Sequence, residues 1–243
     1  MGKKFSYGFV DMHCHVIPAV DDGSKDMEMS LNMLRIAYEN NIRTIIATPH
    51  NKIYIKSVSP KGIHKRIIQL QEEADKEGID IKIYPGNELY YDETLPKRLE
   101  EGNALPMGNS GDILVEFNPS DEYSYISEGL RRLSYEGWNP ILAHCERYEC
   151  FYKDKSRIDE IIDGGVRLQI NSDSVTRGMF NPVGKFVRKL LSQEKISFVS
   201  TDAHRDTGKR VPDMLECAEF IRKKYGEDYA REILYENAIN LLS

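Results

Sequence analysis

The chain has 243 residues, of which 40% are hydrophobic and 30% are charged, and its formal net charge is −6 at pH 7. Such a composition is ordinary for a soluble globular protein, and the length suffices to bury a full core. The negative charge disfavours partners such as nucleic acid or an anionic membrane, and no apolar run approaches the ~18 residues that a membrane-spanning helix needs. The segment MGKKFSYGF lacks the apolar region of a secretory signal, so we expect a cytoplasmic chain that does not insert into a membrane. The four cysteines lack zinc-knuckle spacing, and reduced thiols are the default in such a chain.

Short β-branched runs alternate with amphipathic stretches along the whole chain. We expect parallel strands joined by right-handed helical crossovers, because strands and helices alternate in this way. No linker rich in Pro, Gly or Ser divides them, so we expect a single domain over residues 1–243. The predicted strands are 8–13, 44–48, 81–86, 113–116, 140–144, 166–171 and 197–201, and the predicted helices are 25–40, 59–78, 93–101, 120–136, 155–163, 182–193, 211–225 and 228–240.

Histidines and acidic residues gather at the carboxyl ends of these strands. Five of the six histidines lie there, and His64 alone falls in a helix, where we expect it to face solvent. In a β/α barrel the carboxyl ends of the strands meet at one mouth, whereas an open sheet would string them along an edge. The pattern therefore favours a barrel. The residues at the strand ends are His13, His15, Asp21, Asp22, His50, Glu88, Glu116, His144, Asp202 and His204.

Taken one at a time, each of these residues is more simply explained as a structural hydrogen-bond or salt-bridge partner. Taken together, they point to metal ions. Acidic groups crowded at one mouth would repel one another, and divalent cations relieve that repulsion. Imidazole and carboxylate ligands suit Zn²⁺, Mn²⁺ or Fe²⁺, and the number of ligands is enough for two or three ions. Such centres assist phosphoryl transfer, and Arg147 and Arg210 follow two of the strands, where they could bind phosphate in bidentate fashion.

Two other features of the sequence bear on its chemistry. Cys14 and Cys145 each follow a histidine, but the sixth residue after each is Val20 or Phe151 rather than Arg, which argues against a cysteine nucleophile. The segment 40–71 has no acidic residue, so it could attract an anionic substrate, although a solvated helix face explains it equally well. Its basic residues are Arg43, Lys52, Lys56, Lys61, Lys65 and Arg66.

Several motifs occur together and in order along the chain: DMHCH, VDDG, TPH, GNELYY, VEF, AHCERY, INS and STDAH followed by Arg210. This series resembles the PHP (polymerase and histidinol phosphatase) superfamily. It is most similar to the bacterial protein-tyrosine phosphatase branch, the CpsB/YwqE-type enzymes of capsule and exopolysaccharide loci. The resemblance implies a distorted (β/α)7 TIM-like barrel, the PHP fold, with three divalent metal ions. Mn²⁺ is favoured, and Fe²⁺ or Zn²⁺ is possible.

The resemblance also implies roles for individual residues. The first metal would be held by His13, His15, Glu88 and Asp202, the second by Glu88 as a bridge with Glu116 and His144, and the third by Asp22, His50 and His204. Arg147 and Arg210 would bind phosphate, and Asp202 and His50 count among the catalytic residues as well as the ligands. The loop before Arg210 is one residue longer than the pattern, so Lys209 is an alternative. Asp21 and Cys14 are expected to be structural.

The implied reaction is metal-dependent hydrolysis of phosphotyrosine in the tail of a bacterial tyrosine autokinase, without a phosphoenzyme, which would regulate capsule or exopolysaccharide synthesis. Four alternatives stay open. A small-molecule phosphatase such as histidinol phosphatase would share the metals. An amidohydrolase would need a metal-bridging lysine, which is not evident, and a nuclease is disfavoured by the net charge. A metal-stabilised binding module would keep the ligands without turnover.

Overall fold

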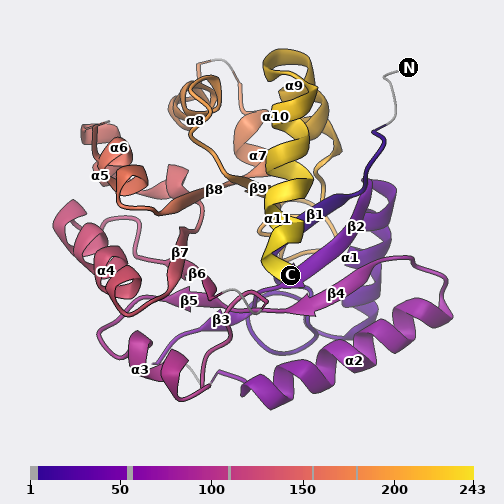
Figure 1. Ribbon diagram of the computed structural model, residues 1–243. Helices are drawn as coiled ribbons and strands as arrows, with labels where there is room; N and C mark the ends of the chain where they lie inside the picture. The colour runs from indigo at the N-terminus through magenta and orange to yellow at the C-terminus, as the bar shows by residue number, and fades with distance from the viewer. Residues whose placement is uncertain (1–4, 54–56, 109–110, 155, 179) are drawn as a thin grey trace.

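The computed structural model describes residues 5–53, 57–108, 111–154, 156–178 and 180–243. Its parallel strands form a curled sheet with helices outside it (Figure 1). All named strand pairs are parallel, as the alternation of strands and helices predicted. The strands are β1 (Phe9–Cys14), β2 (Ile42–Ala47), β3 (His50–Asn51), β4 (Lys82–Pro85), β5 (Glu88–Tyr90), β6 (Asp112–Glu116), β7 (Asn139–Leu142), β8 (Arg167–Asn171) and β9 (Phe198–Ser200).

The strands pair in two sheets, ordered β1-β2-β4 and β3-β5-β6-β7-β8-β9. Only two residues separate β2 from β3, and two separate β4 from β5, so the chain crosses from one sheet to the other within a single extended run. The far edges also meet. The Asp202 amide donates to the His13 carbonyl at 2.8 Å, and the His15 amide donates to the Ala203 carbonyl at 2.9 Å. The sheet therefore curls until its first strand touches the segment after its last.

Most of the helices cover the outer face of this curled sheet, while residues 237–242 pack against its inner side (Figure 1). Several begin at a capping side chain. Asp26 accepts from the Met29 amide, Ser59 from the Gly62 amide, and Asn181 from the Gly184 amide, which satisfies amides that the first turn leaves free. The helices are α1 (Met27–Glu39), α2 (Pro60–Lys76), α3 (Leu95–Glu100), α4 (Tyr123–Tyr135), α5 (Glu149–Lys153), α6 (Ser156–Asp163), α7 (Ser172–Val175), α8 (Pro182–Ser192), α9 (Leu215–Tyr225), α10 (Glu227–Arg231) and α11 (Asn237–Ile239), with the short turns η1 (Cys145–Arg147), η2 (Glu232–Glu236) and η3 (Asn240–Leu242).

The core has two parts. One large apolar cluster lies between the sheet and the helices. A smaller cluster includes Val10 and Phe198 from the strands and Leu241 from the last turn. A Cβ on Gly108, just before β6, would lie 1.9 Å from the Leu241 carbonyl oxygen, so only glycine fits this approach. The C-terminal turn thus covers the end of the sheet where β6 begins. It does not cover the opposite end, where the carboxyl ends of the strands lie.

All seven predicted strands occur, shifted by no more than two residues at either end. The short strands β3 and β5 were not predicted, because they begin with a histidine and a glutamate and are too short to show any alternation. The helices α5 and α7 were also missed. Residue 155, where one predicted helix begins, and Lys56 of the basic segment lie outside the described residues. Among the described helices, none is long and apolar enough to cross a lipid bilayer.

Candidate metal centre

The histidines of β1 reach the interior because the strand changes phase. Val10 and Met12 belong to the smaller apolar cluster inside the curl of the sheet, which we call the inner cluster. Phe9 and Cys14 belong to the large cluster between the sheet and the helices, which we call the outer core. A register irregularity lies between Asp11 and Cys14, and such an irregularity re-aims the side chains beyond it. Cys14 is fully buried in the outer core, and burial raises the pKa of its thiol well above the ordinary value. Its predicted structural place is therefore confirmed.

The first predicted ligand set is brought together as one buried group: His13, His15, Glu88 and Asp202. Each offers one ligand atom, and these atoms lie within 4.8 Å of one another. The Nε2 atoms of His13 and His15 lie 3.3 and 3.2 Å from the Glu88 Oε2 atom. They lie 3.5 and 3.6 Å from the Asp202 Oδ1 atom. All four side chains are at most 1% exposed.

Glu88 also faces the residues predicted for a second metal. The His144 Nε2 atom lies 2.9 Å from Glu88 Oε1 and 3.7 Å from Glu116 Oε1. The second metal was predicted to bind Glu88, Glu116 and His144. The three residues here whose ligand atoms all lie within 4.8 Å of one another are instead His50, Glu88 and Glu116. Lys52 ends close by, with its Nζ atom 3.0 Å from Glu116 Oε2. Glu88 therefore has one oxygen toward each of two ligand sets, as a bridging carboxylate would.

The third predicted set also comes together, with one addition. Asp22, His50 and His204 form a group that includes His15 as well. The Asp22 Oδ1 atom lies 3.4 Å from His50 Nε2 and 3.5 Å from His204 Nε2. The Asp22 side chain is 64% exposed, so this group forms the open side of the site. His64, the remaining histidine, is exposed on α2, as expected.

The chemistry of these side chains fits divalent cations. The Glu88 Oε2 and His50 Nδ1 atoms are buried without a hydrogen-bond partner although they are 2.9 Å apart. Burial alone would raise the pKa of Glu88, but the neighbouring His13 and His50 hold it well below its ordinary value. Burial alone would lower the pKa of His50, but Glu88 and Asp22 raise it to about 10. Without metal the cluster therefore retains protons on histidine, and imidazole and carboxylate donors together suit Mn²⁺, Fe²⁺ or Zn²⁺.

Two residues to which no metal role was assigned orient these histidines. Gln169 is fully buried, and its Oε1 atom accepts from the His144 amide at 2.7 Å and from His13 Nδ1 at 3.1 Å. Asp21 accepts from His15 Nδ1 at 2.7 Å. The bonds to the Nδ1 atoms of His13 and His15 leave the Nε2 atoms of these two rings facing the cluster, which is how partners of metal-binding histidines act. The bond to His144 holds its backbone. No role was predicted for Gln169 from the sequence. The one available signal was an amide side chain in a predicted strand, two residues before Asn171.

The two predicted phosphate-binding arginines meet at one carboxylate. The Arg147 Nη2 atom lies 2.5 Å from Asp202 Oδ2, and the Arg210 Nη2 atom lies 2.8 Å from Asp202 Oδ1. The Arg210 Nη2 atom is also 3.2 Å from His204 Nε2. Both side chains are more than a third exposed, so their free edges can reach a ligand. Lys209 is exposed, and of the two candidates it is Arg210 that contacts the cluster.

Three residues of the site have strained backbone conformations. His144, Asp202 and Arg210 have φ values of 33°, 51° and 61°, in the left-handed region that non-glycine residues seldom adopt. Hydrogen bonds from the His144 amide to Gln169 and from the Asp202 amide to the His13 carbonyl hold two of these turns. Residues in such conformations cluster at functional sites, where the surrounding structure maintains them.

Comparison with known proteins identifies relatives over nearly the whole chain. The family model described as "Capsular polysaccharide synthesis, CpsB/CapC" matches residues 9–243. The tyrosine-protein phosphatase CpsB of Streptococcus pneumoniae is 31% identical over 233 residues, which cover 94% of this chain and 96% of that protein.

Solved structures agree. A structure reported with YwqE from Bacillus subtilis and CpsB from S. pneumoniae, "unique metal-dependent tyrosine phosphatases", superposes with a TM-score of 0.87. It is 29% identical and covers 96% of this chain and 94% of its own. Histidinol phosphate phosphatase from Lactococcus lactis superposes with a TM-score of 0.63 at 18% identity, covering 91% of this chain and 95% of its own. At that identity the likeness is one of fold.

Proposed function

This chain belongs to the CpsB/CapC family of capsular polysaccharide synthesis, and from that premise we propose that it is a metal-dependent protein-tyrosine phosphatase. The observation that carries the proposal is the convergence of five histidines and four carboxylates beside two arginines that share Asp202. The relatives named as tyrosine phosphatases match over most of this chain, whereas the histidinol phosphatase resembles it only in fold. A protein-tyrosine phosphatase is therefore favoured over a small-molecule phosphatase such as histidinol phosphatase.

We propose three divalent metal ions, Mn²⁺ by preference. His13, His15, Glu88 and Asp202 would hold one, Glu88, Glu116 and His144 a second, and Asp22, His50 and His204 a third. His50 also lies in one group with Glu88 and Glu116, and His15 in one group with Asp22 and His204, so each could help to hold a second ion. When bound, such ions act as Lewis acids toward phosphoryl oxygens and lower the pKa of water.

The chain's own part in the reaction is to bind and orient the phosphoryl group. Arg147 and Arg210 would bind its oxygens through the guanidinium edges that Asp202 does not occupy, since guanidinium groups recognise phosphate in bidentate fashion. Asp202 orients both, so the phosphoryl group would be held beside the metal ligands. Donors fixed in this way bind the phosphoryl group in the ground state and the transition state alike. Cys14 and Cys145 are poor candidates for a thiolate nucleophile, because both are fully buried and burial raises the pKa of their thiols well above the ordinary value.

On the same premise we propose the barrel fold, the domain extent, the substrate and the location of the protein. The curled sheet is a distorted (β/α)7 barrel, which the hydrogen bonds joining β1 to the segment after β9 support. Residues 1–243 form one domain, which the family match over residues 9–243 supports. The substrate is the phosphorylated tail of a bacterial tyrosine kinase that acts in capsule or exopolysaccharide synthesis. The protein works in the cytoplasm, where its four buried free cysteines would stay reduced.

The proposal is tested with purified protein loaded with Mn²⁺ and given three substrates separately: a phosphotyrosine peptide, histidinol phosphate and p-nitrophenyl phosphate. We expect the phosphotyrosine peptide and the aryl phosphate to be hydrolysed, and a chelator to abolish both reactions. Turnover of histidinol phosphate alone would overturn the proposal. No turnover of any substrate by metal-loaded protein would instead favour a binding module.

A further inference from the structure

A cavity of about 730 Å³ lies beside the two arginines of the candidate site. Its inner end is lined by Arg147, Asn171, Thr201 and Arg210. Asn171 belongs to the site as well, because its Nδ2 atom donates to Asp202 Oδ2 at 3.0 Å. The cavity is therefore continuous with the position proposed for the phosphoryl group and extends away from it.

One wall of the cavity is the turn after α7. Arg177 lines this wall, and Arg188 of α8 holds its backbone in place by donating to the Arg177 carbonyl at 2.7 Å. A Cβ on Gly184 would lie 2.9 Å from that same carbonyl oxygen, so α8 packs tightly beneath the turn. The Arg177 side chain is 38% exposed and pairs with Asp173 at 2.9 Å. Contacts with α8 thus hold the backbone of this turn in place, while the Arg177 side chain remains accessible.

A second wall of the cavity is the segment from Gly208 to the start of α9. The amides of His204 and Arg205 both donate to the Arg210 carbonyl, at 2.9 and 3.1 Å. Ser172 Oγ donates to the Asp213 carbonyl at 2.9 Å, which ties this segment to α7 at the base of the cavity. Glu216 lines the outer part of this wall and is exposed in the first turn of α9.

The lining is mixed: Val211 and Cys217 lie beside polar groups, and both signs of charge are present. Arg177 and Lys209 line the cavity together with Asp173, Asp213 and Glu216. A wholly apolar small molecule would match only part of this lining and would cover charged groups, which is costly. A polypeptide offers backbone donors and acceptors along its length together with side chains of either charge, and can satisfy such a lining.

We infer that this cavity binds the polypeptide that flanks the phosphotyrosine of the substrate. The inference rests on the proposed phosphatase function and extends it to the part of the substrate beyond the phosphoryl group. Pockets that enclose a drug-sized ligand measure about 300–1,000 Å³, so the cavity has room for much more than one phosphate. Contacts here hold substrate without touching the reacting atoms, so they add binding energy equally to the ground state and the transition state.

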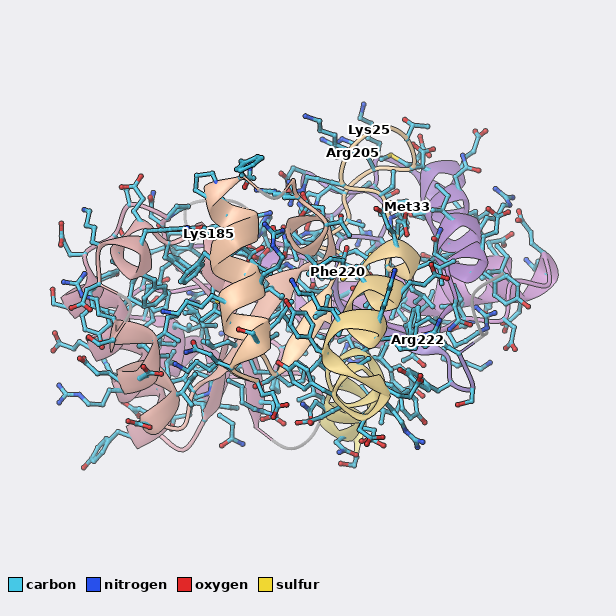
Figure 2. The ribbon with its side chains drawn as sticks, turned by 90° about the horizontal axis from the view of Figure 1, so that it is seen from above. Lys25, Met33, Lys185, Arg205, Phe220 and Arg222 are labelled. Carbon is cyan, nitrogen blue, oxygen red and sulfur yellow. The ribbon has the colours of Figure 1, made fainter. Side chains whose placement is uncertain are left out.

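The test compares a phosphotyrosine peptide with p-nitrophenyl phosphate on the full, metal-loaded chain. The variants are Arg177→Ala and Glu216→Gln, at two lining side chains from different segments of the chain. Lys185→Ala is the matched control, because Lys185 is exposed on α8 and does not line the cavity (Figure 2). We expect KM for the peptide to rise about fivefold or more in at least one cavity variant, as for interface side chains worth about 1 kcal/mol. The constants for p-nitrophenyl phosphate should stay at the wild-type values.

Each other outcome has a definite meaning. If both variants match Lys185→Ala on the peptide, the cavity does not bind the substrate and the inference is wrong. If a variant loses activity on both substrates equally, it acts through the site or the fold, and the inference is likewise wrong. If the wild-type protein hydrolyses p-nitrophenyl phosphate but not the peptide, the proposed function fails first. Circular dichroism of each variant identifies a loss of fold.

Discussion

Gln169 offers a sharp test of how the metal centre is built, because it supports two predicted ligands from outside the cluster. Its Oε1 atom faces a backbone amide, which can only donate, so the orientation of the side-chain amide is determined. The same oxygen accepts from His13 Nδ1, and the side-chain nitrogen donates to the Asn171 Oδ1 atom at 3.0 Å. Gln169→Leu keeps a similar volume and removes all of these bonds.

The size of the effect follows from the groups left unpaired. The His13 Nδ1–H and His144 N–H donors would both be buried without an acceptor, at a cost of about 1–3 kcal/mol each in stability. Removing the hydrogen-bond partner of a metal-binding histidine lowers metal affinity by about 10–100-fold. Gln169→Glu retains an acceptor for both donors, so it should recover part of the affinity. It also adds a buried charge, so recovery should be incomplete.

The assay is calorimetric titration of metal-free protein with Mn²⁺, with the bound metal counted by elemental analysis and the fold followed by circular dichroism. We expect weaker binding for Gln169→Leu and an intermediate affinity for Gln169→Glu, in protein that remains folded. A folded Gln169→Leu protein with wild-type Mn²⁺ affinity and stoichiometry would refute the reasoning. It would mean that His13 and His144 need no support from Gln169.

Four further predictions concern the site. Asp202→Ala or His144→Ala should abolish phosphatase activity while the far-ultraviolet circular dichroism spectrum stays native, and a variant that keeps most of its rate would contradict the metal assignment. Arg147→Ala should mainly raise KM in steady-state kinetics, because its guanidinium binds rather than reacts; a fall in kcat alone would argue otherwise. Cys145→Ala should retain kcat, and iodoacetamide should leave the native enzyme active, since burial raises the pKa of that thiol well above its ordinary value. Burial opposes protonation of His50, but Glu88 and Asp22 raise its pKa to about 10, above the ordinary value of about 6.5. The proton on His50 therefore stabilises the metal-free fold below about pH 6.5, and this stabilisation is lost as the pH rises through about 10. Metal must displace that proton, so Mn²⁺ affinity should increase with pH over this window, and titrations in buffers of different ionisation enthalpy should detect proton release; a pH-independent affinity would count against it.

Much of the architecture could be predicted because its signals are local. Each of the seven predicted strands contains one or more β-branched residues. The main helices have an apolar face, and some have a recognisable start, as at Asp26 and Ser59. The strands β3 and β5 were missed for the opposite reason. Their pairing depends on neighbours far away in the chain, such as Glu88 beside Leu114, and two or three residues are too few to show a periodicity.

The sequence by itself determined which residues could form the metal centre, because ligand types placed after successive parallel strands must share one end of the sheet. It also indicated the two arginines. Only the tertiary structure decided how the ligands are grouped, with His50 beside Glu116 and His15 beside Asp22. The physical reason is that distances between strand ends depend on the curl and register of the whole sheet. A single irregularity in β1 likewise decides that His13 faces inward and Cys14 outward.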